Sequence, residues 1–495
     1  QYTAPEIKFS FNTGIGYGSH TGVPVPVYAY GPGSENFTGT LDNTDIFYAM
    51  VAALDLSKES GSCLEEKSRL DMANEELLKR RSLSMGSSPI FYKEPVHLVR
   101  GEGIWLYDDS NNKYMDCYNN VPCVGHCHPH ILDALTKQAG QLNTHSRYLS
   151  SVVVDYSERL MSFHSDPLSV LQMGCSGTEA IEIAIKMARL ATGGQGIICS
   201  NATYHGNSHE TIRMTIGPFE PDFIRVPFPE KFRPVKDGLS DEDLCNCYLE
   251  EIQGAINQFR DNNIPLAGML FCSIFANEGL PDVPSGFMAK AASLVREAGG
   301  VVILDEVQAG FCRTGSWWGY ELNDCVPDIV AMGKPMGSGY PLSGVGTSTE
   351  IAEIFHKKSY YFNTTASTPL QAAVGNAVLD VIEEENLLEN VNDVGNYLKQ
   401  KVGDFSETYD IVGDVRGTGL FVAIECVLGQ GNNEPNKKLA EDIVETMKQK
   451  GFLISNAGQY RNVLKIRPPL VYQREDADSL CEALEETFDE FIKKI

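Results

Sequence analysis

Two short runs of apolar residues near the middle of the chain predict neighbouring strands of a buried parallel sheet. Val301 to Leu304 is a continuous β-branched and aliphatic run, and Ile329 to Met332 is a second. A run that is apolar at every position is typical of a strand covered on both faces. The first run stops on the carboxylates Asp305 and Glu306, and the second leads through one glycine to Lys334. Because ligands bind where strands end in open α/β sheets, this stretch is the predicted centre of the protein.

One lysine and one carboxylate at two strand ends suit a cofactor that carries an aldehyde and a pyridine ring. Lys334 can hold the aldehyde as a Schiff base, while Asp305 keeps the ring nitrogen protonated. The simpler alternative is that Asp305 and Glu306 cap a helix or lie in a solvated loop, and that Lys334 is a surface charge. These residues by themselves leave both interpretations open.

The remaining apolar pattern alternates between strands and helices, as in an α/β protein. A helix over 285–299, with Ser285 as its N-cap, leads into the Val301 strand and completes a βαβ unit. One further predicted helix runs from Pro129 to about Gln141, and another runs from near Ser176 to about Thr192. Three more cover 370–385, 387–402 and 475–495. Further strands are predicted within 101–116, 197–200, 267–274, 412–424 and 462–469.

Small and hydroxyl residues at the start of the helix near Ser176 suit an anion. Ser176, Gly177 and Thr178 would present free backbone N–H groups there, and the helix dipole adds to the attraction. An ordinary serine N-cap explains the same residues. Tyr204 and His205 follow the 197–200 strand and offer an aromatic face and an imidazole, although a tyrosine in that place is more often part of the core.

The first part of the chain differs in composition from the rest. Residues 1–56 are rich in Gly, Pro, Thr and Tyr, and they resemble the carboxy-terminal end of the alkaline phosphatase family. The resemblance implies that His20 matches a zinc ligand, but one imidazole cannot hold a catalytic zinc, so we expect this segment to be inactive. Residues 57–86 form a linker with a short amphipathic helix over 65–81, whose apolar stripe is Leu70, Ala73, Leu77 and Leu78.

Charge and cysteine content exclude several classes of function. The net charge of −26 argues against nucleic acid or an anionic membrane as partner, and no apolar run approaches the roughly 20 residues of a membrane span. Thirteen cysteines without paired spacing favour reduced thiols in an intracellular setting, either cytoplasm or mitochondrion. Cys123 to His128 holds Cys and His, but no second pair lies at a finger-like distance, so no metal site is expected. The chain begins at Gln1 without methionine, so the question whether a targeting signal precedes it stays open.

From about Met85 to its end, the chain resembles the class III (fold-type I) pyridoxal-phosphate aminotransferases. The spacing of Asp305, Gln308 and Lys334 carries the resemblance together with several further motifs. It implies pyridoxal 5'-phosphate as the cofactor, with Lys334 as the Schiff-base lysine and proton shuttle and Asp305 on the pyridine nitrogen. The other roles that it implies are ring contacts for Val307 and Gln308, a phosphate cup of Ser176, Gly177 and Thr178, ring stacking by Tyr204 with His205 beside it, and a phosphate contact to the neighbouring subunit from Thr364.

Four motifs narrow the resemblance to the alanine–glyoxylate aminotransferase 2-like and ethanolamine-phosphate phospho-lyase branch. They are Gly125–Pro129, Leu142–Leu149, Val412–Gly417 and Val463–Leu470. Two departures stand out. Cys272 and Ser273 replace a glutamate that partners a switching arginine, so we expect a narrow choice of amine donor. Lys465 replaces a carboxylate-binding arginine, with Arg467 two residues on, and we expect only one of the two to face the pocket.

The predicted protein is therefore an α/β enzyme of the fold-type I class, with a large, mostly parallel sheet and a smaller α+β domain from the chain ends. We expect the large cofactor-binding domain over 87–385 and the small domain over 386–495. The predicted reaction is amino transfer from an ω-amino acid or small amine to a keto acid such as pyruvate or glyoxylate, in a homodimer. The alternative is a phospho-lyase acting on a phosphorylated amino alcohol, for which Arg147, Lys465 and Arg467 are the candidate substrate-binding cations. A zinc phosphatase is the third and least supported class.

Overall fold

The computed structural model describes residues 10–11, 27–28, 74–215, 221–429 and 431–493. The chain divides into two compact units, residues 1–89 and 90–495. In the first unit β1 (Ser10–Phe11) pairs antiparallel with β2 (Val27–Tyr28), and α4 spans Asn74–Met85. The predicted linker helix is thus described from Asn74, and it runs past Arg81 to Met85. His20 and residues 57–73 lie outside the described residues.

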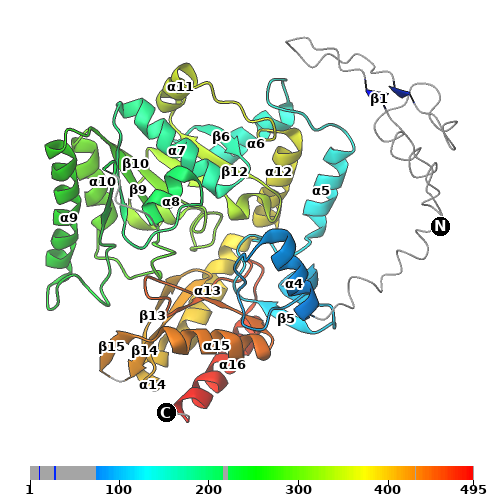
Figure 1. Ribbon diagram of the computed structural model, residues 1–495, viewed down its shortest axis with the longest axis vertical. Helices are drawn as coiled ribbons and strands as arrows, with labels where there is room; N and C mark the ends of the chain where they lie inside the picture. Colours follow the sequence, from blue (N-terminus) through cyan, green and yellow to red (C-terminus); the bar gives the residue numbers. More distant parts are fainter. Residues whose placement is uncertain (1–9, 12–26, 29–73, 216–220, 430, 494–495) are drawn as a thin grey trace. The chain divides into compact units, whose positions relative to one another are not determined.

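A seven-stranded sheet forms the centre of the second unit, in the order β6-β12-β11-β10-β9-β7-β8 (Figure 1). All of its strands run parallel except β12, which is antiparallel to both of its neighbours. The mostly parallel sheet that the apolar runs predicted is confirmed. The strands are β6 (Val170–Gly174), β7 (Gly196–Ser200), β8 (Phe223–Val226), β9 (Leu266–Cys272), β10 (Val301–Asp305), β11 (Ile329–Met332) and β12 (Ser343–Thr347).

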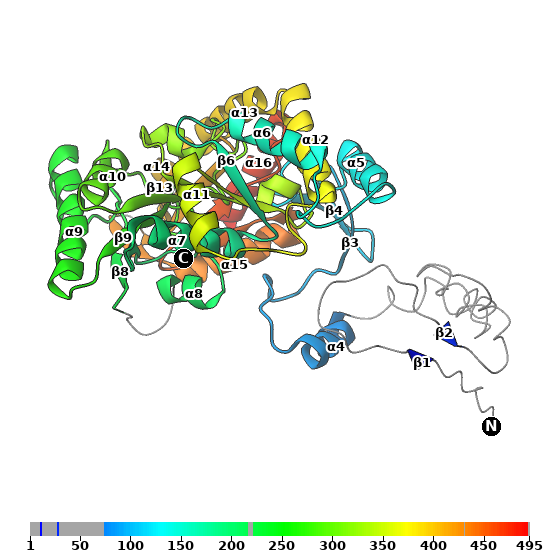
Figure 2. The ribbon, with the colours of Figure 1, turned by 90° about the horizontal axis from the view of Figure 1, so that it is seen from above.

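Helices cover both faces of this sheet, which explains why its strands are apolar at every position. On β10, Ile303 packs in the cluster formed with α7 (Gly177–Thr192) and α11 (Thr349–Lys358). Val302 and Leu304, its neighbours, pack on the opposite face in the larger core. That face is covered by α6 (Ser151–Ser162), α9 (Asp241–Asp261), α10 (Phe287–Glu297) and α12 (Pro369–Glu384), and α5 (Pro129–Ala139) lies beside α12 (Figure 2). On the first face, α8 (His209–Thr215) lies beside α7.

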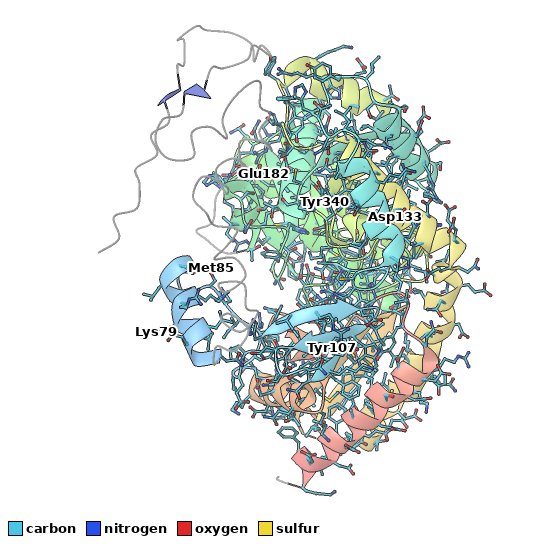
Figure 3. The ribbon with its side chains drawn as sticks, turned by 90° about the vertical axis from the view of Figure 1, so that its right-hand side faces the viewer. Lys79, Met85, Tyr107, Asp133, Glu182 and Tyr340 are labelled. Carbon is cyan, nitrogen blue, oxygen red and sulfur yellow. The ribbon has the colours of Figure 1, made fainter. Side chains whose placement is uncertain are left out.

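A smaller α+β part is built from both ends of the second unit, as predicted. β16 (Phe452–Leu453) pairs parallel with β5 (Lys113–Asp116), and β4 (Trp105–Asp108) and β3 (Leu98–Glu102) extend that sheet. Tyr107 marks this sheet in Figure 3, beside the carboxy-terminal helices. A second sheet has the order β13-β14-β18-β17, from Val412–Thr418, Phe421–Gly429, Val463–Ile466 and Ser455–Ala457, with β15 (Asn432–Pro435) on β14. The helices are α13 (Leu387–Gly403), α14 (Phe405–Thr408), α15 (Lys437–Gln449) and α16 (Arg474–Ile492).

Two local predictions were wrong. The helix predicted from Ser285 begins at Phe287, and its N-cap is Gly286, which takes a left-handed φ of 73° and makes no side-chain cap. The backbone N–H of Ser285 instead donates to Asp241 Oδ2 in the first turn of α9 (3.0 Å). The turn and one strand predicted over 412–424 are instead two strands of a hairpin, because Gly419 (φ 54°) reverses the chain between β13 and β14.

A buried ion pair ties the small part to the large sheet. Arg416 on β13 and Glu425 on β14 are 3% and 1% exposed at their side chains and form an ion pair. The Arg416 guanidinium also donates to the backbone oxygens of Gly279 and Leu280, both at 3.0 Å, in the loop that follows β9. Arg233 and Asn462 supply further donors to Glu425. Burial of both charges is tolerated because nearly every polar atom of the pair has a partner.

We expect Arg416→Ala to lower the free energy of unfolding by about 3–5 kcal/mol, because it strands the buried charge of Glu425. Urea unfolding followed by circular dichroism measures the loss. The matched control is Arg474→Ala, which removes an equal charge from a pair with Asp393 whose side chains are 53% and 50% exposed. That change should cost under about 1 kcal/mol. Equal losses in the two variants would show that the Arg416 pair has no special structural role.

Candidate active site

The two predicted catalytic residues lie at the ends of adjacent parallel strands. Asp305 ends β10 and is paired in register with Ala331 of β11. Lys334 begins the short 3-10 helix (η3, Lys334–Gly337) that follows β11. The Nζ of Lys334 has no hydrogen bond or ion pair with any residue in the described part of the chain. Burial lowers the pKa of Lys334, and the positive charge of Arg467 lowers it further, while Asp305 acts in the opposite direction. An uncharged amine is the form that attacks an aldehyde.

A hydrogen-bonded chain holds the Asp305 carboxylate in place. Its Oδ2 lies 2.7 Å from His205 Nδ1, and His205 Nε2 lies 2.6 Å from the Thr203 hydroxyl. The other oxygen, Oδ1, accepts the backbone N–H of Val307 (2.9 Å). His205 is 3% exposed and Asp305 is 6% exposed. The carboxylate therefore has a fixed orientation in a dry site, which suits a partner that carries a proton on a ring nitrogen.

The predicted phosphate cup forms the start of α7 beside these strand ends. Ser176 is the N-cap, and its hydroxyl accepts the backbone N–H of Glu179 (3.3 Å), so the simpler interpretation of this serine holds as well. The N–H groups of Gly177 and Thr178 lie in the first turn, where a helix supplies no carbonyl partner. A Cβ on Gly177 would lie only 3.0 Å from Val307, so glycine allows the cup to approach the strand end closely. An anion next to Asp305 and Lys334 fits this cradle.

Tyr204 stands beside the same strand ends and is not a core residue. It is 45% exposed, and it lines a cavity of about 520 Å³ that Lys465 also lines. Its backbone oxygen accepts the side-chain N–H of Asn277 (2.9 Å). The ring is thus available to stack on a bound group, as the resemblance implied, whereas the core packing that tyrosines more often adopt does not occur here.

Lys465 and Arg467 converge on one oxygen of Gln308. Lys465 Nζ donates to Gln308 Oε1 at 3.0 Å, and Arg467 Nη1 donates to the same atom. The expectation that only one of them faces the pocket was wrong. Side chains alternate along a strand with a period of two, so residues 465 and 467 point to the same side. We call Lys465 and Arg467 the anion clamp.

The anion clamp is not neutralised by acidic side chains. Within the described residues, neither Lys465 nor Arg467 forms an ion pair with a carboxylate, and both are about 4% exposed. Their other partners are the backbone oxygens of Ala276 and Tyr118, both at 3.0 Å. Burial, followed by the positive charge of Arg467, lowers the pKa of Lys465 well below its usual value. Two buried cations that share one neutral oxygen form a ready site for an anion.

Two other predicted residues lie away from the clamp. The guanidinium of Arg147 stacks over the Phe362 ring, 3.9 Å from its centroid, and Arg147 is exposed. Thr364 is exposed in the turn that follows Phe362. The next residue, Thr365, lies 3.5 Å from the thiol of Cys175, just before the phosphate cup.

The sequence analysis missed three residues that complete the site: Thr203, Asn277 and Tyr118. Asn277 Oδ1 accepts the side-chain N–H of Gln308 (2.9 Å), so it connects the clamp to the Tyr204 loop. Asn277 follows β9, and the strand-end argument used for Asp305 could have found it. Tyr118 precedes the large sheet, and no local pattern marks it. Cys272, which replaces the family glutamate, is paired in register with Asp305, and burial raises the pKa of its thiol.

Neither a metal cluster nor a membrane span is present in the part of the chain that the structure describes. No group of three or more His, Cys, Asp and Glu side chains could hold a metal ion there. Instead, His126 bonds to Asp116 (2.7 Å) and His128 to Glu385 (3.0 Å). No helix among those residues is long and apolar enough to cross a membrane.

Comparison with known proteins places most of the chain in one family. Residues 90–488 match the family described as Aminotransferase class-III, and residues 2–56 match Alkaline phosphatase. An alanine–glyoxylate aminotransferase 2-like protein of Drosophila melanogaster is 35% identical over 82% of this chain and 85% of its own length. An ethanolamine-phosphate phospho-lyase homolog of Caenorhabditis elegans is 34% identical over 84% and 93% of the two chains.

The solved structures agree with this placement. A phospholyase from Arthrobacter in complex with phosphoethanolamine superposes with a TM-score of 0.81 at 38% identity, covering 83% of this chain and 99% of that one. Three observations point to the same family: the fold-type I architecture, the lysine and carboxylate at the strand ends, and the sequence matches. The chain belongs to the class III aminotransferases, a family of enzymes that depend on pyridoxal phosphate.

Proposed function

We propose that this chain binds pyridoxal 5'-phosphate between the ends of β10 and β11 and the start of α7. Lys334 would hold the aldehyde carbon, and Asp305, oriented by His205, would face the ring nitrogen. The N–H groups of Gly177 and Thr178, with Ser176, would hold the phosphate. Val307, Gln308 and Tyr204 would line the ring. The observation that carries the proposal is the placement of a partnerless, low-pKa lysine one strand away from a buried, doubly hydrogen-bonded carboxylate.

The protein residues divide the work of catalysis among them. When bound, pyridoxal phosphate supplies an electron sink for a carbanion next to the substrate nitrogen. Lys334 Nζ, whose pKa is lowered first by burial, can take the proton from the substrate carbon that carries the amine. Asp305 is held in a fixed orientation next to the ring nitrogen because His205 and the Val307 N–H bond to its two oxygens. Lys465 and Arg467 bind the substrate's anionic group and thereby orient that carbon.

The reaction that we propose first is amino transfer from a small amine or ω-amino acid to a keto acid. It is the reaction of the family and of the aminotransferase-named relatives. The anion clamp would hold the carboxylate of donor and acceptor in turn. With Cys272 in place of the family glutamate, no carboxylate stands at that position to pair with Arg467, so the clamp stays open to an anion throughout the cycle.

A second candidate is elimination of phosphate from a phosphorylated amino alcohol, and the geometry of the clamp favours it specifically. A dianionic phosphate needs several donors at one spot, and Lys465 and Arg467 meet on one atom. The Arthrobacter phospholyase, solved with phosphoethanolamine, supports the same candidate. Both reactions begin with proton removal by Lys334, and they differ in whether a leaving group is attached to the next carbon.

We also propose that the enzyme is a homodimer, in which Thr364 contacts the phosphate held by the other subunit. The exposure of Thr364, in a turn that lies next to the phosphate cup, supports this. Sedimentation velocity of the holoenzyme is expected to show a dimer at micromolar concentration, and Thr364→Ala should weaken cofactor retention. An active monomer would contradict the proposal.

Residues 1–56 would take no part, and their deletion should leave turnover unchanged.

Lys334→Ala should abolish turnover, because no other described lysine follows a strand next to Asp305. Borohydride reduction of the holoenzyme followed by peptide mapping should label Lys334. The variant should still bind pyridoxal phosphate through the cup, with weaker affinity. The control is Lys358→Ala, at the end of α11, which should keep full turnover and labelling. A label on any other lysine would overturn the assignment.

Asp305→Asn should lower kcat by orders of magnitude with little change in thermal stability, because an amide cannot keep the ring nitrogen protonated. His205→Asn, which removes only the orienting contact, should cause a smaller loss. Steady-state rates and thermal unfolding of both variants provide the measurement. Turnover of Asp305→Asn near that of the wild type would refute the role of Asp305.

Phosphoethanolamine supplied without a keto acid distinguishes the two candidate reactions. Amino transfer should then stop after one equivalent, because no acceptor regenerates the starting form of the cofactor. Elimination should continue over many turnovers and release phosphate, ammonia and acetaldehyde. Arg467→Gln should weaken either reaction by about tenfold or more in kcat/KM, since one charged hydrogen bond contributes about 1.5–3 kcal/mol. The second arm supplies β-alanine with pyruvate, where sustained turnover supports transfer. If no amine reacts in either arm, the proposed function fails.

A further inference from the structure

The cavity beside Tyr204 extends past the anion clamp to a polar hairpin. On one side it is lined by the loops that follow β7 and β9, including Tyr204 and Asn277. On the other side it is lined by Asn456 of β17 and by the turn between β17 and β18, including Arg461. Lys465, a member of the clamp, also lines it, so the cavity is continuous with the place where a substrate anion would bind. Its volume of about 520 Å³ exceeds what a two-carbon amine would fill.

The charges on the cavity wall have one sign. Arg461 and Lys465 are its cations, and none of its lining residues is an Asp or a Glu. Most other lining side chains are amides and hydroxyls: Tyr118, Asn201, Thr203, Thr215, Asn277 and Gln459. Such a wall offers many donors and two positive charges, and it favours a ligand that is anionic and polar.

Arg461 is held in place by its own turn. Its backbone has a φ of 58°, which a residue other than glycine seldom adopts. Arg461 Nη2 donates to Asn456 Oδ1 (3.1 Å), and Asn456 Nδ2 donates back to the Arg461 backbone oxygen (2.8 Å). No carboxylate of the described residues forms an ion pair with Arg461. The guanidinium therefore retains donors for a ligand, on a turn that is internally fixed.

The turn is also tied to the catalytic strands. The backbone N–H of Gly458 donates to the Asn277 backbone oxygen (3.1 Å), and the Asn277 side chain accepts from Gln308. Gly458 has a φ of 88°, and a Cβ there would lie 2.9 Å from Val463, so the turn cannot drift without disturbing β18. The turn that carries Arg461 is thus connected through Asn277 to Gln308, which both clamp residues contact.

We propose that Arg461 and Asn456 form a second anion subsite, which binds a carboxylate at the far end of the substrate. The inference rests on the proposed function, because it makes the preferred substrate an amine with two anionic groups. The inner group binds to Lys465 and Arg467, and the outer group binds to Arg461. A single guanidinium with one amide beside it matches a singly charged, planar carboxylate, whereas the two-cation clamp accepts the more highly charged group. Arg461 then determines substrate length.

The test measures binding to the holoenzyme and requires no turnover. Isothermal titration compares straight-chain dicarboxylates from succinate to pimelate with the monocarboxylates of equal length. One dicarboxylate should bind about fivefold to tenfold more tightly than its monocarboxylate, as expected for one partly exposed charged contact. Arg461→Gln should remove this difference and leave monocarboxylate affinity unchanged, while Arg461→Lys should retain part of it. Asn456→Ala, which frees the guanidinium, should reduce it.

Arg260→Gln serves as the matched control, since Arg260 is a 71% exposed arginine on α9 outside the cavity. It should bind every probe as the wild type does. Dicarboxylates that bind no more tightly than monocarboxylates, or equal losses in Arg461→Gln and Arg260→Gln, would overturn the proposal. These titrations do not depend on amine chemistry. If the enzyme turns over amines but binds dicarboxylates no more tightly than monocarboxylates, only the second subsite is refuted. If the protein binds dicarboxylates more tightly than monocarboxylates but reacts with no amine, the second subsite is supported and the proposed function is refuted.

Discussion

Burial of the central sheet on both faces is the constraint on which the site depends. Ile303 packs against α7 on one side, and Val302 and Leu304 pack into the main core on the other, so β10 has no freedom to shift or tilt. Asp305 at its end is consequently fixed before any ligand arrives. The chain must leave the sheet at that point, and the polar groups that cannot be buried without partners are placed there.

The second constraint is electrostatic. Lys334, Lys465 and Arg467 are cations near one strand end, and burial lowers the pKa of each. Such a concentration of buried positive charge is unfavourable in the protein alone, and it is partly relieved by the carbonyl oxygens of Gln308, Ala276 and Tyr118. Two anionic groups, a cofactor phosphate at α7 and a substrate anion at the clamp, would relieve it further. Burial, followed by the positive charge of Arg467, lowers the pKa of Lys334, so the clamp that would bind a substrate anion also acts on the lysine that would move the proton.

In the proposed site, the small part of the fold would supply the substrate-facing groups, and the large sheet would supply the catalytic ones. Lys465 lies on β18, Arg467 follows that strand and Arg461 precedes it, whereas Asp305, Lys334 and the proposed phosphate cup belong to the large sheet and its helices. Arg416, anchored to Glu425 and to the loop after β9, keeps these two parts in register. Substrate preference can therefore change through the β17–β18 turn without altering the lysine or the carboxylate.

The sequence by itself determined the elements of the large sheet and placed Asp305 and Lys334 at the ends of two of its strands. The apolar runs at 301–304 and 329–332 predicted strands buried on both faces, and Asp305 follows the first run while Lys334 follows the second after one glycine. Family motifs predicted a phosphate cup at Ser176–Thr178 and the residues that would line the ring. The cap of α10 was misjudged because a serine and a glycine compete at successive positions, and only the observed φ of Gly286 decides between them.

Tertiary structure decided everything that depends on contacts between distant segments. His205 meets Asp305 across 100 residues, and Lys465 meets Gln308 across 157. The sequence analysis expected only one of Lys465 and Arg467 to face the pocket, and their convergence on a single oxygen required the position of Gln308, in the turn after β10. The same holds for the cavity between Tyr204 and Arg461. Local sequence specifies where a strand ends, whereas the packing of separate layers specifies which strand ends face one another.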